Sequence, residues 1–477
     1  MNYKMVIHTT GQILGVGALC LMASAAVSLV YMEIEGIWLL LSALIAGLLF
    51  GVSRFFKPKD NVFFAKEGLV TVALGWIILS LVGALPFYFS GEIPSYVDSV
   101  FETVSGLTTT GATIINGEPY LILSHGNLFW RSLCHWIGGM GVLVLLVALL
   151  PQASGRSIHM LRAEMPGPVV DKLVPKAKQT ARILYVIYIV LTFLQFIMLL
   201  FGGMPVFESA IHTLGTAGTG GFGVYADSIF RYSPYCQWVI TVFMFIFGIN
   251  FNLFFLALIG RFKLTIRSQE LWTYISVIVA STVLIAFNIR GFYPDFSESL
   301  RHAAFQVSSY ISTTGFTTAN ANAWPTLSKA ILLLLMFLGA CAGSTAGGIK
   351  VSRFVILIKA MHKRIRQVLY PRTVKAIRFE GKSLQDDTIN AVLSYFAIYV
   401  FCFIVLFFVL SFEPFSMETN FSAAASTFNN IGPFFGELST FTDYSVFSKL
   451  AMSFAMLLGR LEIYPMLILF MPATWKK

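Results

Sequence analysis

Residues 308–318, SSYISTTGFTT, form a run of hydroxyl side chains around a glycine, between two long apolar segments. The run contains no charged residue, yet it has too many Ser, Thr and Gly residues for a helix that faces lipid. The whole chain is similarly poor in charge: of its 477 residues, 57% are hydrophobic and 12% are charged, and the mean hydropathy is +0.77. This composition is typical of an integral membrane protein and excludes an ordinary soluble domain.

Ten apolar segments surround this run, and several reach the length of about 20 residues that a membrane-spanning helix needs. The short alternating strands of a closed β-barrel are not seen, so we expect an all-α polytopic membrane protein. The first apolar run is too long for a signal peptide and a second follows at once, which predicts a retained N-terminal hairpin. The segments lie at residues 9–32, 36–54, 68–90, 126–150, 182–203, 235–260, 270–289, 327–349, 388–411 and 446–471.

The connections between these segments differ in their content of Lys and Arg. Residues 91–125 and 412–448 contain neither, whereas residues 350–382 hold a dense basic run. The positive-inside rule therefore places the basic connections and both termini in the cytoplasm, and residues 308–318 outside. The Lys and Arg residues behind the net charge of +10 lie mainly in these cytoplasmic connections. We therefore expect the basic residues to contact the lipid bilayer and not nucleic acid.

Four external connections contain a window of the same length that ends on glycine. Each window is expected to form a short half-helix followed by a polar loop. Any one loop could be a surface turn, but four equivalent copies favour a shared role, and a polar loop at membrane depth must line water or bind a solute. The windows are DSVFETVSGLTTTG at 98–111, ESAIHTLGTAGTGG at 208–221, HAAFQVSSYISTTG at 302–315 and TNFSAAASTFNNIG at 419–432.

Four such loops can surround one axis and bring their backbone carbonyls together, and carbonyl rings can replace the hydration shell of a monovalent cation. Glycine permits the backbone dihedrals that this needs. We therefore predict four helix–pore-loop–helix repeats around a pseudo-fourfold pore, preceded by the N-terminal transmembrane hairpin. The predicted units are residues 1–66 for the hairpin and 67–180, 181–268, 269–386 and 387–477 for repeats one to four, with a Gly-rich loop in repeat three.

The motifs make the sequence resemble the TrkH, TrkG and KtrB superfamily of potassium transporters over almost the whole chain. The N-terminal hairpin makes it closest to a TrkH-like member. The motifs are TTTGAT at 108–113, GTAGTGGFG at 215–223, STTGFTT at 312–318, FNNIGPFFG at 428–436, AGSTAGGIK at 342–350 and LGRLE at 458–462.

The resemblance implies a selectivity filter with one glycine from each repeat. The fourth loop departs from the Thr-Thr-Gly pattern, so the fourfold symmetry is expected to be imperfect. The implied ion-binding residues are Thr109, Thr110, Gly111, Thr219, Gly220, Gly221, Thr313, Thr314, Gly315, Asn430, Ile431 and Gly432.

Residues 337–353, FLGACAGSTAGGIKVSR, predict a helix break, because each glycine weakens a helix by roughly 1 kcal/mol relative to alanine. Close packing through small residues is the alternative reading. Arg460 lies inside the last apolar segment and should meet Glu462, the carbonyls of the Gly-rich loop, or the cytoplasmic surface by snorkelling. The resemblance implies an intramembrane gate loop below the filter, and the implied gate residues are Gly343, Gly347, Gly348, Lys350 and Arg460.

The resemblance also implies the biological role: uptake of K⁺, as the transported ion, across a bacterial cytoplasmic (inner) membrane. It implies a homodimer and a cytoplasmic TrkA-like nucleotide-binding regulatory subunit, because the chain itself has no nucleotide-binding motif and no expected organic cofactor. An ion-coupled secondary transporter of K⁺ or Na⁺ is the alternative. An enzyme is not expected, since the histidines lack the HExxH spacing of a metalloprotease.

Overall fold

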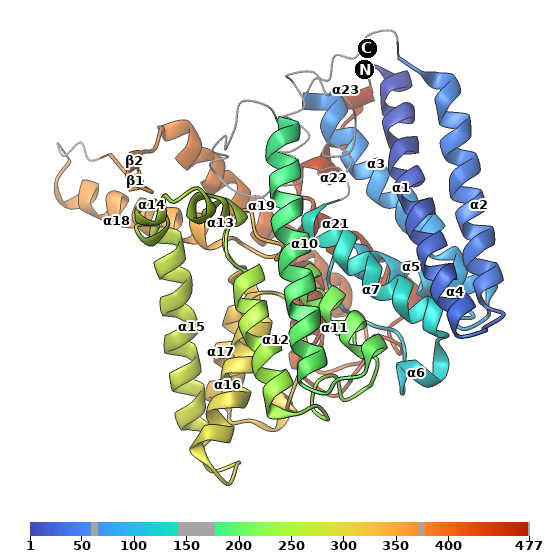
Figure 1. Ribbon diagram of the computed structural model, residues 1–477. Coiled ribbons are helices and arrows are strands. Elements are labelled where there is room, and N and C mark those ends of the chain that lie inside the picture. The colour runs from blue at the N-terminus through green and yellow to red at the C-terminus, as the bar shows by residue number, and fades with distance from the viewer. Residues whose placement is uncertain (59–64, 142–176, 372–375, 476–477) are drawn as a thin grey trace.

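The computed structural model describes residues 1–58, 65–141, 177–371 and 376–475. This part of the chain is predominantly helical, as the composition predicts (Figure 1). A small antiparallel hairpin joins β1 (Arg378–Phe379) to β2 (Lys382–Ser383), with Arg378 opposite Ser383.

The N-terminal hairpin consists of α1 (Tyr3–Val30) and α2 (Gly36–Ser53), followed by the short turn η1 (Arg54–Phe56). The two helices pack closely where they meet, because a Cβ on Gly36 would lie 2.8 Å from the Cβ of Ser28. The Tyr3 hydroxyl donates a hydrogen bond of 2.6 Å to the Trp475 carbonyl, so the two described ends of the chain lie side by side, at the top of Figure 1.

The rest of the described chain repeats one order of elements: a long helix, a short helix, an irregular linker and a second helix. The first set is α3 (Ala65–Gly83), α4 (Leu85–Phe89), α5 (Tyr96–Leu107), α6 (Pro119–Ile122) and α7 (His125–Met140). The second is α10 (Ala177–Phe201), α11 (Val206–Gly218), α12 (Pro234–Phe247), α13 (Phe251–Leu258) and α14 (Phe262–Ile266). The third is α15 (Gln269–Asn288), α16 (Phe296–Ile311), η2 (Ala321–Ala323), α17 (Thr326–Phe337) and α18 (Val351–Leu369). The fourth is α19 (Asp386–Leu410), α20 (Met417–Phe428), α21 (Val446–Arg460), α22 (Tyr464–Ile468) and α23 (Pro472–Trp475).

Six helices of the described chain are long and apolar enough to cross a membrane, or seven if α12 and α13 count as one span. The apolar segments at 235–260 and 446–471 were expected to be single spans, and neither is one continuous helix. The first bends by 90° between α12 and α13, and the second ends at Arg460, before two residues of positive φ, Glu462 and Ile463. Gly248 and Asn250 lie at the first bend, where Asn250 begins a new helix with its side chain as the cap.

The second helices α7, α12, α17 and α21 contain 16, 14, 12 and 15 residues. At 1.5 Å per residue they are about 18–24 Å long, shorter than the roughly 30 Å hydrocarbon core. Serine side chains cap three of them, since Ser124, Ser233 and Ser445 accept hydrogen bonds from the backbone N–H groups three residues on. The C-terminal ends of these helices therefore lie within the protein, and their last carbonyls need hydrogen-bond donors from other parts of the chain.

One carboxylate of the N-terminal hairpin, that of Glu33, binds the start of α7. Glu33 Oε1 accepts hydrogen bonds from the His125 backbone N–H at 2.9 Å and from His125 Nδ1 at 2.7 Å, and Glu33 Oε2 accepts from the Gly126 N–H at 3.3 Å. A carboxylate at a helix N-terminus satisfies N–H groups that have no partner in the helix and complements the helix dipole.

We predict that Glu33→Ala lowers the free energy of unfolding by about 1–2 kcal/mol, because the first turn of α7 loses its cap. The measurement is the thermal unfolding midpoint of the purified protein in detergent. Glu35→Ala is the matched control, since the Glu35 side chain caps no helix. Equal midpoints for the two variants would contradict this account of how the hairpin is held.

Candidate functional site

The four short helices α5, α11, α16 and α20 all lead into a loop with the same backbone. In each loop one non-glycine residue adopts a left-handed conformation, and a glycine two positions later also has positive φ. Asparagine adopts this conformation readily, so the fourth loop keeps the backbone of the others despite its different sequence. The φ values are 57° at Thr109, 56° at Thr219, 55° at Thr313 and 58° at Asn430, then 77° at Gly111, 78° at Gly221, 81° at Gly315 and 99° at Gly432.

The four loops contact one another in cyclic order. A Cβ added to the glycine of one loop would collide with a backbone oxygen of the next, and the series returns to its start. The distances are 2.0 Å from Gly111 to the Gly220 oxygen, 2.0 Å from Gly221 to that of Thr314, 2.0 Å from Gly315 to that of Ile431, and 2.7 Å from Gly432 to that of Thr110. The twelve residues expected at the filter are therefore brought together in one closed ring, joined head to tail.

The ring offers uncharged oxygen atoms. Thr109, Thr219, Thr313 and Asn430 are fully buried, while Gly111, Gly221 and Gly315 are half-buried. Among the described residues no group of three or more His, Cys, Asp or Glu side chains could hold a metal ion. Backbone carbonyls and hydroxyls without a carboxylate suit a monovalent cation that is bound and released, whereas Ca²⁺ sites usually include carboxylates.

On one side of the ring, the linkers that follow the four loops contact one another. The linkers bind one another in the same cyclic order, so they hold the loops together on this side. The bonds run from the Ala226 N–H to Glu118 Oε2 at 3.0 Å, from the Ile229 N–H to the Thr317 carbonyl at 3.0 Å, from the Gly436 N–H to Asn322 Oδ1 at 3.1 Å, and from the Phe441 N–H to the Thr113 carbonyl at 2.9 Å.

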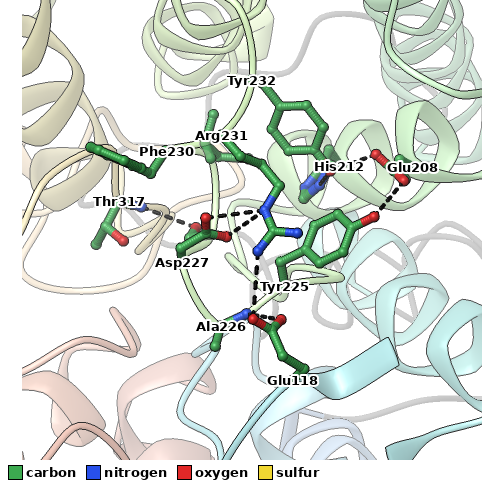
Figure 2. A network of polar contacts seen from close by, with 12 residues as sticks. Glu118, Glu208, His212, Tyr225, Ala226, Asp227, Phe230, Arg231, Tyr232 and Thr317 are labelled. Atoms are coloured by element: carbon green, nitrogen blue, oxygen red, sulfur yellow. Dashed lines mark hydrogen bonds and ion pairs between the residues drawn. The ribbon is translucent and has the colours of Figure 1, made fainter. Parts of the chain in front are cut away.

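Arg231 connects the linkers that follow the first two loops, as Figure 2 shows. Its Nε donates to both carboxylate oxygens of Asp227, at 2.9 and 3.0 Å, and its Nη2 lies 3.5 Å from Glu118 Oε1. Its guanidinium also lies over the ring of Tyr225, 3.6 Å from the centroid. Burial alone would lower the pKa of Arg231, but the bond to Asp227 and the charges of both carboxylates raise that pKa above its ordinary value.

On the side opposite the linkers, the ring meets residues 338–350, which we call the inner loop. The break that the glycines predict is present, because α17 ends at Phe337 and α18 begins at Val351. The two ends of the loop are joined by a bridge between Leu338 and Ile349. Its middle contacts the ring directly: the Thr345 carbonyl accepts from Thr219 Oγ1 at 2.9 Å, and the Gly347 N–H donates to Thr313 Oγ1 at 2.8 Å.

Arg460 joins the inner loop to the end of α7. Its Nη1 donates to the Thr345 carbonyl at 2.6 Å, and its Nη2 donates to the carbonyls of Gly138 and Gly139 at 2.5 and 2.6 Å. The carbonyls of the Gly-rich loop are thus among its partners, as the sequence allowed. Glu462 pairs instead with Arg353, at 2.6 Å.

The remaining expected gate residues lie in or at the inner loop. The Lys350 side chain is buried and donates to the Ala346 carbonyl, so it does not simply begin the cytoplasmic basic run. Gly343 has a φ of 67°, and its carbonyl accepts from the Phe251 N–H at 3.2 Å, at the break between α12 and α13. Gly348 has a φ of 68° and packs against Gly339.

One residue that supports the inner loop was missed from the sequence. Glu270, near the start of α15, accepts hydrogen bonds at Oε1 from the Ala342 N–H at 2.7 Å and from the Ser352 N–H at 3.2 Å. It therefore ties the inner loop, at Ala342, to the first turn of α18, at Ser352. The available signal was an acid at the start of an apolar segment, but its partners lie more than 70 residues away along the chain.

The side chain of Asn430 ties the fourth loop to the first. Its Nδ2 donates to Thr110 Oγ1 and to the Met456 carbonyl, each at 2.9 Å.

We predict that Asn430→Asp, which replaces this donor with an acceptor, lowers the free energy of unfolding by about 1–3 kcal/mol. The readout is thermal unfolding in detergent. Asn322→Asp is the control, because Asn322 uses its oxygen as an acceptor and the carboxylate keeps that bond. A midpoint for Asn430→Asp no lower than the control's would contradict the assignment.

Comparisons with known proteins match this architecture. The family model TrkH, described as a cation transport protein, matches residues 40–291 and 278–477. The Trk system potassium uptake protein TrkH of Salmonella typhimurium is 37% identical over 423 residues, which cover 87% of this chain and 86% of the relative. TrkG of Escherichia coli, with the same system name, is 32% identical across 100% of this chain and 99% of its own.

A solved structure agrees with these matches. The crystal structure of the potassium transporter TrkH from Vibrio parahaemolyticus covers the whole of both chains with a TM-score of 0.90, at 30% sequence identity. The resemblance drawn from the motifs is thereby confirmed: the chain belongs to the TrkH family of cation transport proteins.

Proposed function

We propose that this chain takes up K⁺ across a bacterial cytoplasmic membrane, through a pore at the centre of the ring of four loops. The observation that carries the proposal is the closed cycle of contacts in which each loop glycine meets a carbonyl of the next loop. The names of the relatives, potassium uptake proteins and a potassium transporter, support K⁺ as the ion. Membership in a family of transport proteins also argues against an enzyme.

The chemistry of the ring supports a filter for a partly dehydrated monovalent cation. Its oxygens are uncharged, and the helices α5, α11, α16 and α20 point their C-terminal, partly negative ends toward the loops that form it. The glycines of three loops, Gly111, Gly221 and Gly315, keep part of their surface exposed, which is compatible with an ion reaching the ring. The proposed units are the hairpin at 1–66 and the repeats at 67–180, 181–268, 269–386 and 387–477, with both termini in the cytoplasm.

We propose further that the inner loop and Arg460 close the pore below the ring. The inner loop touches the second and third loops through Thr219 and Thr313, and Arg460 ties it to α7. A guanidinium beneath the ring repels a permeating cation, and the same side chain holds the loop in place. A TrkA-like nucleotide-binding subunit on the cytoplasmic face would move this loop, and two copies of the chain would form the assembly.

We predict that the purified protein in liposomes passes K⁺ and Rb⁺ in preference to Na⁺ and Li⁺, and that Gly315→Ser lowers the K⁺ over Na⁺ ratio roughly tenfold, about 1.4 kcal/mol. The new Cβ would lie 2.0 Å from the Ile431 oxygen and must displace it. Gly91→Ser is the matched control, since Gly91 has a similar φ of 75° but no neighbour within 4 Å.

Flux of wild-type protein that ignores the identity of the ion would overturn the filter. Equal selectivity in Gly315→Ser and Gly91→Ser would do the same. Flux that requires a gradient of H⁺ or Na⁺ in addition to that of K⁺ would favour the secondary transporter.

We predict that Arg460→Ala raises K⁺ flux through the protein reconstituted without a partner subunit, because the variant loses both the positive charge and the bonds to Thr345, Gly138 and Gly139. Arg460→Lys keeps the charge but cannot bind all three carbonyls in the same geometry. Its K⁺ flux should therefore lie between that of the wild-type protein and that of Arg460→Ala. Wild-type flux in a correctly folded Arg460→Ala protein, checked by size-exclusion chromatography, would show that Arg460 is no barrier.

A further inference from the structure

A buried ion pair lies behind the first two loops of the ring. Arg131 Nε and Glu102 Oε1 are 2.6 Å apart, and their side chains are 3% and 0% exposed. Glu102 belongs to α5, which leads into the first loop, and Arg131 belongs to α7, which follows it. Removing one partner of such a pair leaves an uncompensated buried charge, so the two residues act as a unit.

Each partner of the pair holds a different loop. Glu102 accepts hydrogen bonds from Thr113 Oγ1 and from the Ile114 N–H, both at 3.0 Å, just after Gly111 of the first loop. Arg131 Nη1 donates to the Gly223 carbonyl at 3.3 Å, and its guanidinium lies 3.5 Å from the centroid of the Phe222 ring. These two residues come just after Gly221 of the second loop. The ion pair thus spans the seam between the two loops.

The other repeats have no carboxylate at the position of Glu102, nine residues before the loop glycine. They have His212, Gln306 and Ala423 there. Gln306 donates one hydrogen bond, at 3.0 Å, to the Ala319 carbonyl of its own linker, and Ala423 has no polar group to offer. The first two loops are therefore braced by a charged pair that has no counterpart at this position in the other three repeats.

We propose that Glu102 and Arg131 are positioning residues that set the ion selectivity of the ring. The inference rests on the proposed function. At the same seam Gly111 packs against the Gly220 carbonyl, so the spacing of these two loops determines where that oxygen lies. Discrimination between cations depends on the number and placement of the carbonyls around the ion. Loss of the brace lets the two loops separate, and the ring then accepts the smaller and more strongly hydrated Na⁺.

The test compares selectivity with stability. Glu102→Gln removes the charge, and the double substitution Glu102→Met with Arg131→Met removes both charges while roughly keeping volume. Replacing a buried ion pair with apolar side chains is often neutral for stability. We expect both proteins to conduct K⁺ in liposomes but to show a K⁺ over Na⁺ ratio at least about fivefold lower, about 1 kcal/mol. Gln306→Ala, which removes one hydrogen bond at the equivalent position, should keep the wild-type ratio.

The double variant separates positioning from support of the fold. A double variant that melts near the wild-type temperature and has lost selectivity supports the proposal, even if Glu102→Gln alone does not fold. Wild-type selectivity in that stable double variant would overturn it, because the pair would then serve the fold alone. A wild-type protein that does not discriminate K⁺ from Na⁺ would overturn the proposed function, and this inference with it.

Discussion

Four loops approach one another to backbone contact because a glycine, which has no side chain, stands in each, at residues 111, 221, 315 and 432. A Cβ at any of these positions would lie 2.0–2.7 Å from a carbonyl oxygen of the next loop. The contact therefore sets the positions of the half-helices behind the loops, of the linkers above them and of the inner loop below them. Positive φ at the same residues adds a second reason why other residues are strained there.

The membrane imposes the second constraint, because backbone groups without partners are costly in hydrocarbon. Where the second helices end, backbone carbonyls near the ring have no helical partner. Side chains of the protein donate hydrogen bonds to them. Arg460 binds the carbonyls at the end of α7 and in the inner loop, and Glu270 binds the N–H groups of Ala342 in that loop and of Ser352 in the first turn of α18. Arg460 and Glu270 thus both hold the inner loop, which in turn contacts the ring through Thr219 and Thr313.

Much of this arrangement could be predicted from local sequence. The spacing of the four windows identified the loops, and the glycines of residues 337–353 predicted the break after α17. The bend between α12 and α13 was missed, because one glycine in an apolar segment is also compatible with a continuous helix. The pairing of Arg460 with α7 and of Glu102 with Arg131 could not be derived, since each joins residues brought together only by the packing of different helices.

The four loops are proposed to bind a monovalent cation on the axis of their ring. Anomalous diffraction from crystals of this protein grown or soaked in Rb⁺ tests it most directly. The account predicts an anomalous peak within coordination distance of the carbonyls of Thr110, Gly220, Thr314 and Ile431, and its loss when Na⁺ replaces Rb⁺. Rb⁺ peaks elsewhere in the protein with none inside the ring would contradict it.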